Sequence, residues 1–251
     1  MAGAHSLRNA GRRAVALAAA GLLGGGLSLA ARAALAVPTP VTVAVISQSG
    51  DARYAPRRLE QAYPGHPHGR PLVAARMAAE EAGVELDVLG LSLKVIELSI
   101  ADMQGLPAAL AQLKAAGVRH VLADLPAPAL RQLVQLAPAA LGGVMVFNIS
   151  LEDDALRGEQ CASHLLHTLP SAQMRSDALA QYLAARNWRK LLLLQGPEPQ
   201  DALQAQALVR SAQRYGLKIV QTRPFKLGTD PRERDLANTR LLTGEIGRAH
   251  V

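Results

Sequence analysis

Short runs of aliphatic residues alternate with longer segments of helical periodicity through the middle of the chain. The runs have the length and β-branched composition of buried strands. The segments between them repeat apolar residues at helical spacing and stop at glycines such as Gly83 and Gly117. The pattern predicts strands at 41–47, within 84–100, at 120–125 and at 144–149, and helices at 72–82, 106–116 and 129–141. Such a series predicts an α/β fold with a parallel sheet that helices cover on both faces.

An irregular stretch at 150–171 interrupts the alternation, which then resumes. The pattern beyond it predicts a helix at 174–186, a strand at 190–195, a helix at 202–215 and a strand at 217–222. Two α/β series joined by a segment of different character predict two lobes, at 37–166 and 167–244. The second lobe has only two clear strands, too few for an independent α/β layer, so it is expected to be incomplete.

The first 36 residues have the pattern of a secretory signal peptide. Arg8, Arg12 and Arg13 precede an apolar run at 14–31, and the small residues at 34–36 match the usual cleavage pattern. We therefore expect cleavage near Ala36 and export to the periplasm. A retained transmembrane helix is one alternative, although the run only just reaches spanning length. A twin-arginine signal is another, although the bulky residues that usually follow the arginine pair are missing.

The charge balance changes once this segment is set aside. The 251 residues include 27 basic and 20 acidic ones, with a net charge of +7 and an isoelectric point near 10.1. Residues 1–36 hold four of the basic residues and none of the acidic ones, which leaves 23 against 20, or +3. The remaining chain has no long Lys/Arg cluster and few aromatic residues, so it is not expected to bind nucleic acid.

The last seven residues, 245–251, have the sequence EIGRAHV. Read back into DNA, this string resembles the start of a sequencing-library adapter. We expect a non-native tail here, with the natural coding sequence breaking off near Gly244. A natural polar tail is the alternative.

Catalytic and cofactor motifs are missing from the sequence. It has no nucleophile elbow, no Walker loop, no H-E-x-x-H and no G-x-G-x-x-G after a strand. The single cysteine excludes a disulfide framework and a four-cysteine metal site. Cys161, His164 and His167 have a C-x-x-H-x-x-H spacing, but on a helix they would point in different directions. We predict no metal, no cofactor and no catalytic residue, while a nucleophilic pair of Cys161 with a histidine stays open.

Polar residues stand where three predicted strands end. They are Ser47, Gln48 and Ser49 after the first strand, Asp124 at the end of the third, and Asn148 and Ser150 at the end of the fourth. Ligands of open α/β sheets bind at the carboxyl ends of parallel strands, so these side chains are expected to line one side of a cleft. The alternative is that they only begin loops or cap helices.

Several segments resemble one known family. They are 123–126 (ADLP), 154–171, 181–201 and 214–225. These residues resemble the periplasmic substrate-binding proteins of ABC transporters with the type I, branched-chain-amino-acid-binding-like fold. Within that family they are most similar to the group encoded beside PQQ-dependent alcohol dehydrogenase systems. The resemblance extends over roughly 41–235 and is weak between 47 and 100.

The resemblance implies a monomeric, bilobed protein that traps a small polar metabolite by hinge closure and delivers it to a membrane permease, without covalent chemistry. From their position at strand ends, we expect Asp124, Asn148 and Ser150 to supply hydrogen bonds to the ligand from the first lobe, with His167 beside the hinge. Arg57, Arg58 and the HPHG loop at 66–69 receive no ligand role. Two other functions stay open: a periplasmic ligand-sensing module of the same fold without transport, and a Cys- or metal-dependent hydrolase.

Overall fold

A computed structural model describes residues 37–54, 69–226 and 231–243. The predicted signal peptide at 1–36, the predicted tail at 245–251, and Arg57, Arg58 and residues 66–68 lie outside the described residues. Contacts between Cα atoms group the described chain into two units, residues 37–41 with 80–94 and all the others. Among the described residues, no helix combines the length and the apolar composition that crossing a bilayer requires.

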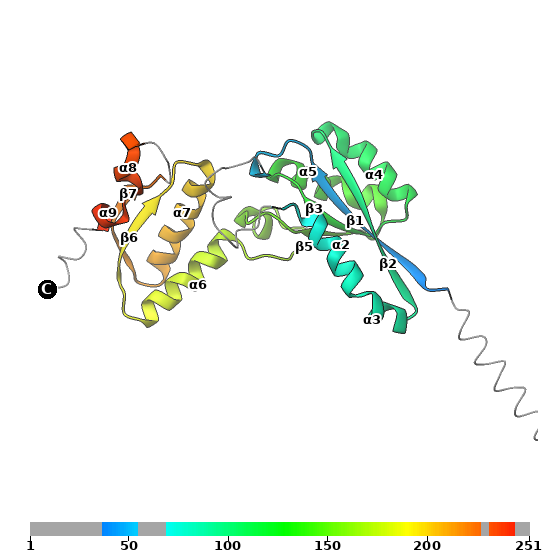
Figure 1. The fold of residues 1–251 in the computed structure, drawn as a ribbon, viewed down its shortest axis with the longest axis horizontal. Coiled ribbons are helices and arrows are strands. Elements are labelled where there is room, and N and C mark those ends of the chain that lie inside the picture. Colours follow the sequence, from blue (N-terminus) through cyan, green and yellow to red (C-terminus); the bar gives the residue numbers. More distant parts are fainter. Residues whose placement is uncertain (1–36, 55–68, 227–230, 244–251) are drawn as a thin grey trace, which may run out of the picture. The chain divides into compact units, whose positions relative to one another are not determined.

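The larger sheet has five strands in the order β2-β1-β3-β4-β5 (Figure 1). Their bounds are β1 Thr39–Gln48, β2 Leu91–Ile100, β3 His120–Asp124, β4 Met145–Asn148 and β5 Leu165–His167. The pairs from β1 through β5 are parallel, with Ser47 opposite Asp124 and Ala123 opposite Asn148. The carboxyl ends of these strands therefore meet at one edge of the sheet, as the sequence predicts.

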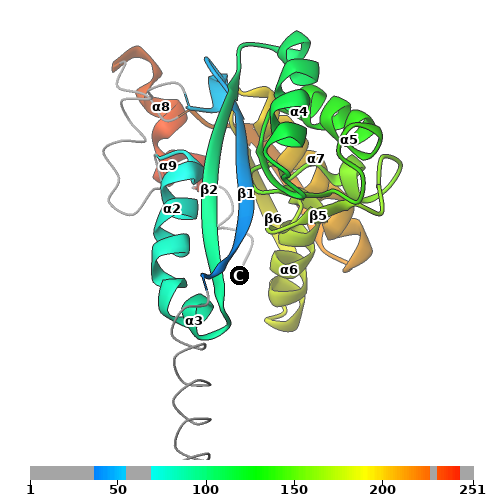
Figure 2. The same ribbon diagram turned by 90° about the vertical axis from the view of Figure 1, so that its right-hand side faces the viewer.

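Strands β1 and β2 lie side by side (Figure 2). The Thr39 N–H donates to the Gly90 carbonyl at 2.8 Å, and the Ser49 N–H donates to the Ile100 carbonyl at 2.9 Å. Both bonds join residues with the same separation along the chain, which is the relation of a parallel pair. The chain thus runs from β1 outward to β2 and then returns to the other side of β1 to form β3.

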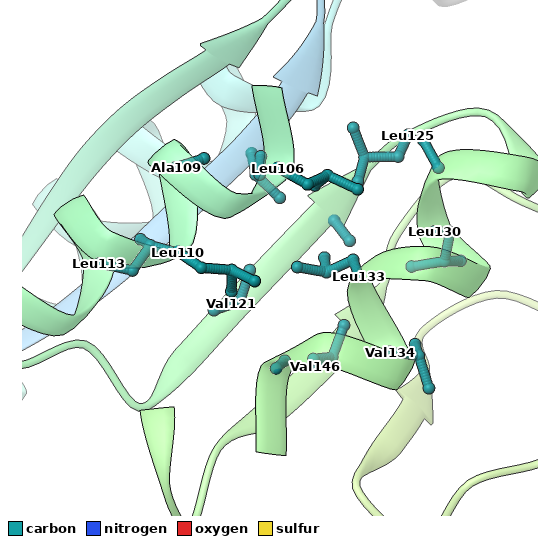
Figure 3. Close-up of a cluster of buried hydrophobic side chains, with 14 of the residues drawn as sticks. Leu106, Ala109, Leu110, Leu113, Val121, Leu125, Leu130, Leu133, Val134 and Val146 are labelled. Atoms are coloured by element: carbon teal, nitrogen blue, oxygen red, sulfur yellow. The ribbon is translucent and has the colours of Figure 1, made fainter. Parts of the chain in front are cut away.

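One face of this sheet is buried under two helices, α4 (Leu106–Ala115) and α5 (Ala127–Leu141). Leu106, Leu110 and Leu113 of α4 and Leu130 and Leu133 of α5 point toward the strands (Figure 3). The strands supply every second residue to this core, namely Ala44, Ile46, Val121, Ala123, Val146 and Leu165. Alternate residues of each strand therefore pack against one apolar face of each helix, as in other α/β layers.

The opposite face of the same sheet is covered only in part by the described residues. Leu122 and Phe147 are half-buried there, and Leu166 of β5 is 43% exposed. Among the described residues, the expectation that helices cover both faces is met in full on the face under α4 and α5, while on the other face Val45 is buried and the outer strands are less covered. The helix after β1, α2 (Pro71–Glu81), contributes no buried residue.

The strand predicted within 84–100 is confirmed and occupies 91–100. The helix predicted at 72–82 is α2, which ends at Glu81, but Gly83 begins a further short helix, α3 (Gly83–Val88), that the sequence pattern does not predict. The apolar and polar residues of 84–88 alternate as in a strand, but the Leu86 N–H donates to the Ala82 carbonyl at 2.9 Å, which is a helical bond. The glycine with left-handed backbone is Gly90, with φ +66°, directly before β2. The chain reverses there because glycine adopts this φ without steric cost.

The stretch predicted as irregular contains two short elements, a 3₁₀ turn, η4 (Asp154–Arg157), and the fifth strand. Strand β5 has only three residues, too few to show a period of two. His167, which the prediction assigns to the second lobe, pairs with Asn148 in the first sheet. Three further 3₁₀ turns are η1 (Ala52–Tyr54), η3 (Met103–Gly105) and η5 (Pro231–Glu233).

The second α/β series forms a separate two-stranded parallel sheet. It consists of α6 (Ala172–Ala185), β6 (Lys190–Gln195), α7 (Pro199–Arg214) and β7 (Lys218–Pro224), followed by α8 (Arg234–Ala237) and α9 (Thr239–Thr243). The predicted strand at 190–195 is confirmed residue for residue. The buried core here is small and is built from Ala180, Ala212 and Leu217.

A network of hydrogen bonds joins α6 to α7. The Ser211 hydroxyl donates to the Asp177 carboxylate at 2.7 Å, and Gln173 donates to both residues. The hydrogen bond from Ser211, with those from Gln173 and Arg214, holds the pKa of Asp177 below its ordinary value despite partial burial. Polar contacts therefore join α6 to α7 in addition to the apolar contacts of this series.

We expect Leu133→Ala to lower the free energy of unfolding by about 2–5 kcal/mol, because it leaves a cavity in the core under α5. Leu136→Ala on the same helix is the matched control, since Leu136 is 37% exposed, and it should cost about 1 kcal/mol or less. Urea denaturation of both variants measures the difference. Equal losses would contradict the packing described for this face.

Candidate functional site

The loop after β1 carries a charged cluster that reaches the ends of two neighbouring strands. Arg53 donates from Nε to both oxygens of Asp51, at 3.1 and 3.0 Å, and a terminal nitrogen approaches Asp51 Oδ2 to 2.6 Å. The same nitrogen contacts Asp124 Oδ1 at 3.2 Å, and the other terminal nitrogen contacts the Ser150 hydroxyl at 2.8 Å. One guanidinium thus joins the loop after β1 to the ends of β3 and β4.

Asp124 is the last residue of β3, and its side chain is 1% exposed. Its Oδ1 accepts hydrogen bonds from Arg53 and from the Tyr54 hydroxyl at 2.7 Å. Its Oδ2 is buried and accepts no hydrogen bond from the described residues, and the Arg70 guanidinium lies 3.8 Å from it. Buried carboxylate oxygens are normally paired, so Oδ2 is an open hydrogen-bond position inside the protein.

Tyr54 lies between the two arginines of the cluster. The Arg70 guanidinium stands 4.6 Å from the centre of its ring, and the Arg53 guanidinium stands 5.6 Å from it. Burial, followed by the hydrogen bond to Asp124 and its negative charge, raises the pKa of Tyr54 well above the ordinary value. The phenol therefore stays protonated and donates to Asp124 at any physiological pH.

Asp51 is the second buried carboxylate of the cluster, with its side chain 3% exposed. Burial alone raises the pKa of Asp51, but the hydrogen bonds from Arg53 and the charges of Arg53 and Arg70 together outweigh it. The pKa of Asp51 consequently lies below its ordinary value. Two arginines thus face two aspartates, so the cluster has no net charge.

Asn148, at the end of β4, has both polar atoms of its side chain hydrogen-bonded within the protein. Its Oδ1 accepts from the backbone N–H groups of Ser150 and Leu151 at 3.3 and 2.9 Å. Its Nδ2 donates to the Leu151 carbonyl at 2.7 Å and approaches His167 Nδ1 to 3.0 Å. Both lone-pair directions and both hydrogens are occupied, so Asn148 holds the loop that presents Ser150.

His167 is in the neutral form that this contact requires. Because Asn148 donates, His167 Nδ1 must accept, which places the ring proton on Nε2. Burial, and then the charge of Arg157, lower the pKa of His167, while a backbone hydrogen bond with Leu156 acts in the opposite direction. The neutral imidazole is therefore the form that the folded protein favours.

The structure brings together three of the four residues that the sequence singles out. Asp124 and Ser150 share Arg53 as a donor, and Asn148 positions Ser150. His167 contacts Asn148 and has no hydrogen bond to Asp51, Arg53, Tyr54, Arg70 or Asp124 of the cluster. The ligand roles predicted for all four stay predictions.

Sequence reasoning missed Asp51, Arg53, Tyr54 and Arg70. They lie in loop or 3₁₀ segments without hydrophobic periodicity, and only the fold shows that the loop after β1 turns back over β3. A usable signal was present, since Asp51 and Arg53 directly follow a buried strand. Loops in this position carry the ligand groups in open α/β sheets.

The cluster lies where the strand order reverses. From β1 the chain proceeds to β2 on one side, and β3 and β4 lie on the other. In open parallel sheets, ligands bind at this switch point, outside the carboxyl ends of the two strands that flank it. Asp51 and Arg53 follow β1, and Asp124 ends β3.

A pocket of about 390 Å³ lies at the carboxyl end of β6, lined by residues of α6 and α7. Its charged groups are already engaged, since Arg175 pairs with Glu152 and the Asp201 carboxylate accepts from the Glu198 N–H at 3.0 Å. Several leucines complete its wall, among them Leu179, Leu193 and Leu208. Ser176, Gln195 and Gln204 add polar side chains to the lining.

The C-x-x-H-x-x-H residues do not come together as metal ligands. Cys161 is exposed, and His164 Nε2 lies 2.8 Å from the Val134 carbonyl. Among the described residues, no three histidine, cysteine or carboxylate side chains gather closely enough to hold an ion.

Comparison with known proteins identifies the class. The sequence matches the family described as "Periplasmic binding protein" over residues 64–236. This match spans more than half of the chain, so the chain belongs to this family, a class of solute-binding proteins. A search of curated protein sequences finds no match.

Solved structures show the same fold. An ABC transporter substrate-binding protein from Desulfitobacterium hafniense, in complex with leucine, is 19% identical with a TM-score of 0.53, over 83% of this chain and 56% of that chain. A leucine-, isoleucine-, valine-, threonine- and alanine-binding protein from Brucella ovis, in a closed conformation, is 15% identical with a TM-score of 0.56, over 84% and 52%. A branched-chain amino acid ABC transporter periplasmic ligand-binding protein from Burkholderia xenovorans LB400 is 17% identical with a TM-score of 0.56, over 80% and 51%.

This chain therefore spans just over half the length of the solved structures that it resembles. The likeness confirms the type I periplasmic binding protein fold that the sequence predicts. At these identities it shows the fold alone.

We expect Arg53→Ala to lower the free energy of unfolding by about 3 kcal/mol, because it removes the main partner of the buried Asp51 carboxylate and one of the partners of the buried Asp124 carboxylate. Arg76→Ala removes an exposed pair with Glu97 and should change stability by about 0.5 kcal/mol or less. Denaturation midpoints of both variants test this. A loss for Arg53→Ala no larger than for the control would show that the cluster does not hold the strand ends together.

The pKa of His167 is lowered in the folded state, so protonation favours the unfolded chain. The stability that neutral His167 contributes is present above its ordinary pKa of 6.5 and is lost as the pH falls below that value. His167→Gln keeps an acceptor for Asn148 and should flatten the dependence of stability on pH below 6.5. His120→Gln, at an exposed histidine of β3, is the control. Parallel pH profiles for wild type and His167→Gln would rule this out.

Proposed function

We propose that this chain is the extracytoplasmic solute-binding component of an ABC transporter. It holds a small polar solute at the carboxyl edge of the five-stranded sheet and passes it to a membrane permease. Family membership supports the class, and the position of the Arg53–Asp124 cluster at the switch point between β1 and β3 carries the assignment of the site. The protein is exported with cleavage near Ala36, is monomeric, and catalyses no reaction.

The open Oδ2 of Asp124 selects the chemistry of the solute. A buried acceptor without a donor costs about 1–3 kcal/mol, which a hydroxyl or ammonium group of a bound solute would recover. Arg70 is 33% exposed and stacks on Tyr54 beside this oxygen. A movement of Arg70 opens the way to Asp124 and keeps a cation available for a carboxylate on the same solute.

Asp124, Ser150 and Asn148, all singled out from the sequence, have different roles in this proposal. Asp124 accepts from the solute, and Ser150 presents its hydroxyl at the same edge. Asn148 is a positioning residue, because its own hydrogen bonds are used up within the loop. Binding then acts as differential affinity, since a solute held more tightly by the closed protein shifts the equilibrium toward closure.

Solutes that carry a hydroxyl or amino group should raise the thermal midpoint, by an amount equivalent to about 2.7 kcal/mol at a hundredfold excess over Kd. The panel consists of short hydroxy acids, amino acids and amino alcohols. For a solute that stabilises the wild type, Asp124→Asn should lower the affinity about tenfold or more, because an amide group replaces the open oxygen.

Asp87→Asn, which removes an exposed carboxylate of α3, is the matched control and should leave the affinity unchanged. Calorimetry gives both values. An Asp124→Asn protein that folds and binds as tightly as the control would reject the placement of the solute at this edge.

A further inference from the structure

Basic residues outnumber acidic ones three to one in the second α/β series. Residues 172–226 include nine arginines and lysines and three carboxylates. Three of the arginines pair with carboxylates: Arg175 with Glu152, Arg210 with Asp154 and Arg214 with Asp177. Near the carboxyl end of β7, Arg223 contacts the Leu242 carbonyl, and Lys226 pairs with Glu233.

The other four cations are exposed, and none has a carboxylate of the described residues within salt-bridge distance. They are Arg186, Arg189, Lys190 and Lys218. Arg186 caps the C-terminus of α6, and Lys190 begins β6 directly opposite Lys218 at the start of β7. The Lys218 N–H donates to the Arg189 carbonyl at 2.7 Å. All four therefore gather at the amino edge of this sheet.

The acidic residues of the series lie away from this edge. Glu198 and Asp201 stand at the start of α7, just after the carboxyl end of β6. Since α7 has 16 residues, they are about 24 Å from the end of the helix that returns to the amino edge. Asp177 is engaged by Ser211, Gln173 and Arg214. Nothing in this series neutralises the four cations.

Two large aromatic side chains are exposed at the same edge. Trp188, the only tryptophan of the chain, is 59% exposed, and Tyr182 is 50% exposed. Their rings meet edge to face with centres 6.3 Å apart, and the Arg186 guanidinium lies 5.3 Å from the Tyr182 ring. The loop that joins α6 to β6 and carries Trp188 can be followed in Figure 1. Exposed aromatic clusters of this kind mark surfaces that contact another phase or molecule.

Helix dipoles account for only part of this arrangement. Helices α6 and α7 both end at the amino edge, where a cation stabilises the C-terminal carbonyls. That explains Arg186, which caps α6. It does not explain Lys190 and Lys218, which stand side by side at strand starts, where like charges repel. Nor does it explain an exposed indole.

We propose that the edge formed by Tyr182, Arg186, Trp188, Arg189, Lys190 and Lys218 binds the anionic surface of a phospholipid bilayer. Lysines and arginines near such a surface are attracted to its charged headgroups, and tryptophan and tyrosine settle at headgroup level. None of the six residues lines the pockets of about 390 and 360 Å³ that the described residues of this series form around β6. A lipid surface requires no groove, whereas an acidic peptide is normally held in one. The inference goes beyond the proposed function and does not depend on it.

Co-sedimentation of the full chain with vesicles tests this directly. Vesicles of phosphatidylglycerol mixed with phosphatidylcholine are compared with phosphatidylcholine alone. All variants share residues 1–36, so any contribution of the apolar run at 14–31 and of the arginines before it cancels when the variants are compared. Lys190→Ala/Lys218→Ala should lower the partition coefficient for the anionic vesicles about 25-fold, or about fivefold per cation. The matched control is Lys94→Ala/Lys114→Ala, which removes the same charge from two exposed lysines elsewhere and should stay within about threefold of wild type.

The single tryptophan makes the second readout specific to the site. Emission from Trp188 should shift to the blue with anionic vesicles, and bromine-labelled lipid should quench it, in wild type and in the control alone. Circular dichroism confirms that both variants are folded.

Equal losses in the two double variants would assign the binding to net charge and overturn the proposal. So would anionic binding without a change in Trp188 emission. Absence of binding to anionic vesicles would also overturn it, and the edge would then be reassigned to an acidic protein partner. Solute binding, measured separately by calorimetry, reports on the proposed function and is unaffected by any of these outcomes.

Discussion

Burial of the Asp124 carboxylate is the constraint on which the first sheet and its candidate site depend. A carboxylate that is 1% exposed is tolerated only where donors and cations surround it. Arg53, Tyr54 and Arg70 meet that need, and in doing so they draw the loop after β1 across the ends of β3 and β4. One oxygen nevertheless stays without a hydrogen bond. The interaction that closes this edge of the sheet is also the one that leaves room for a donor from outside.

The strand order explains why this cluster forms where it does. Because β2 and β3 flank β1 on opposite sides, the segments that follow β1 and β3 both begin at the carboxyl edge of the sheet, and Arg53 and Tyr54 after β1 reach the end of β3 there. Asn148 is likewise a buried polar residue at the end of a strand, β4, and its side-chain amide holds the loop that follows by accepting hydrogen bonds from the Ser150 and Leu151 N–H groups. Polar residues at strand ends thus have two separate roles. Asn148 holds the loop that follows its strand, whereas Asp124 keeps one oxygen without a hydrogen bond.

The net charge of the chain does not reveal where its cations gather on the surface. Without its first 36 residues the chain has a net charge of only +3 and no long basic run. In the folded second series, ion pairs neutralise some of the cations, and the sheet brings Arg189 and Lys190 beside Lys218, which is 28 positions further along the chain. Local concentration of charge therefore arises from strand pairing and not from composition.

The sequence by itself determined the α/β alternation and the strand at 190–195, because hydrophobic period is a local property. Its resemblance to a known family indicated the periplasmic binding protein fold, and the ligand role of Asp124 stays a prediction. The sequence pattern failed at α3, where five residues alternate as in a strand, and at β5, where three residues are too few to show a period. Only the tertiary structure decided that Arg53, Tyr54 and Arg70 surround Asp124. Those contacts join residues about 54 to 71 positions apart across loops, and no local pattern encodes them.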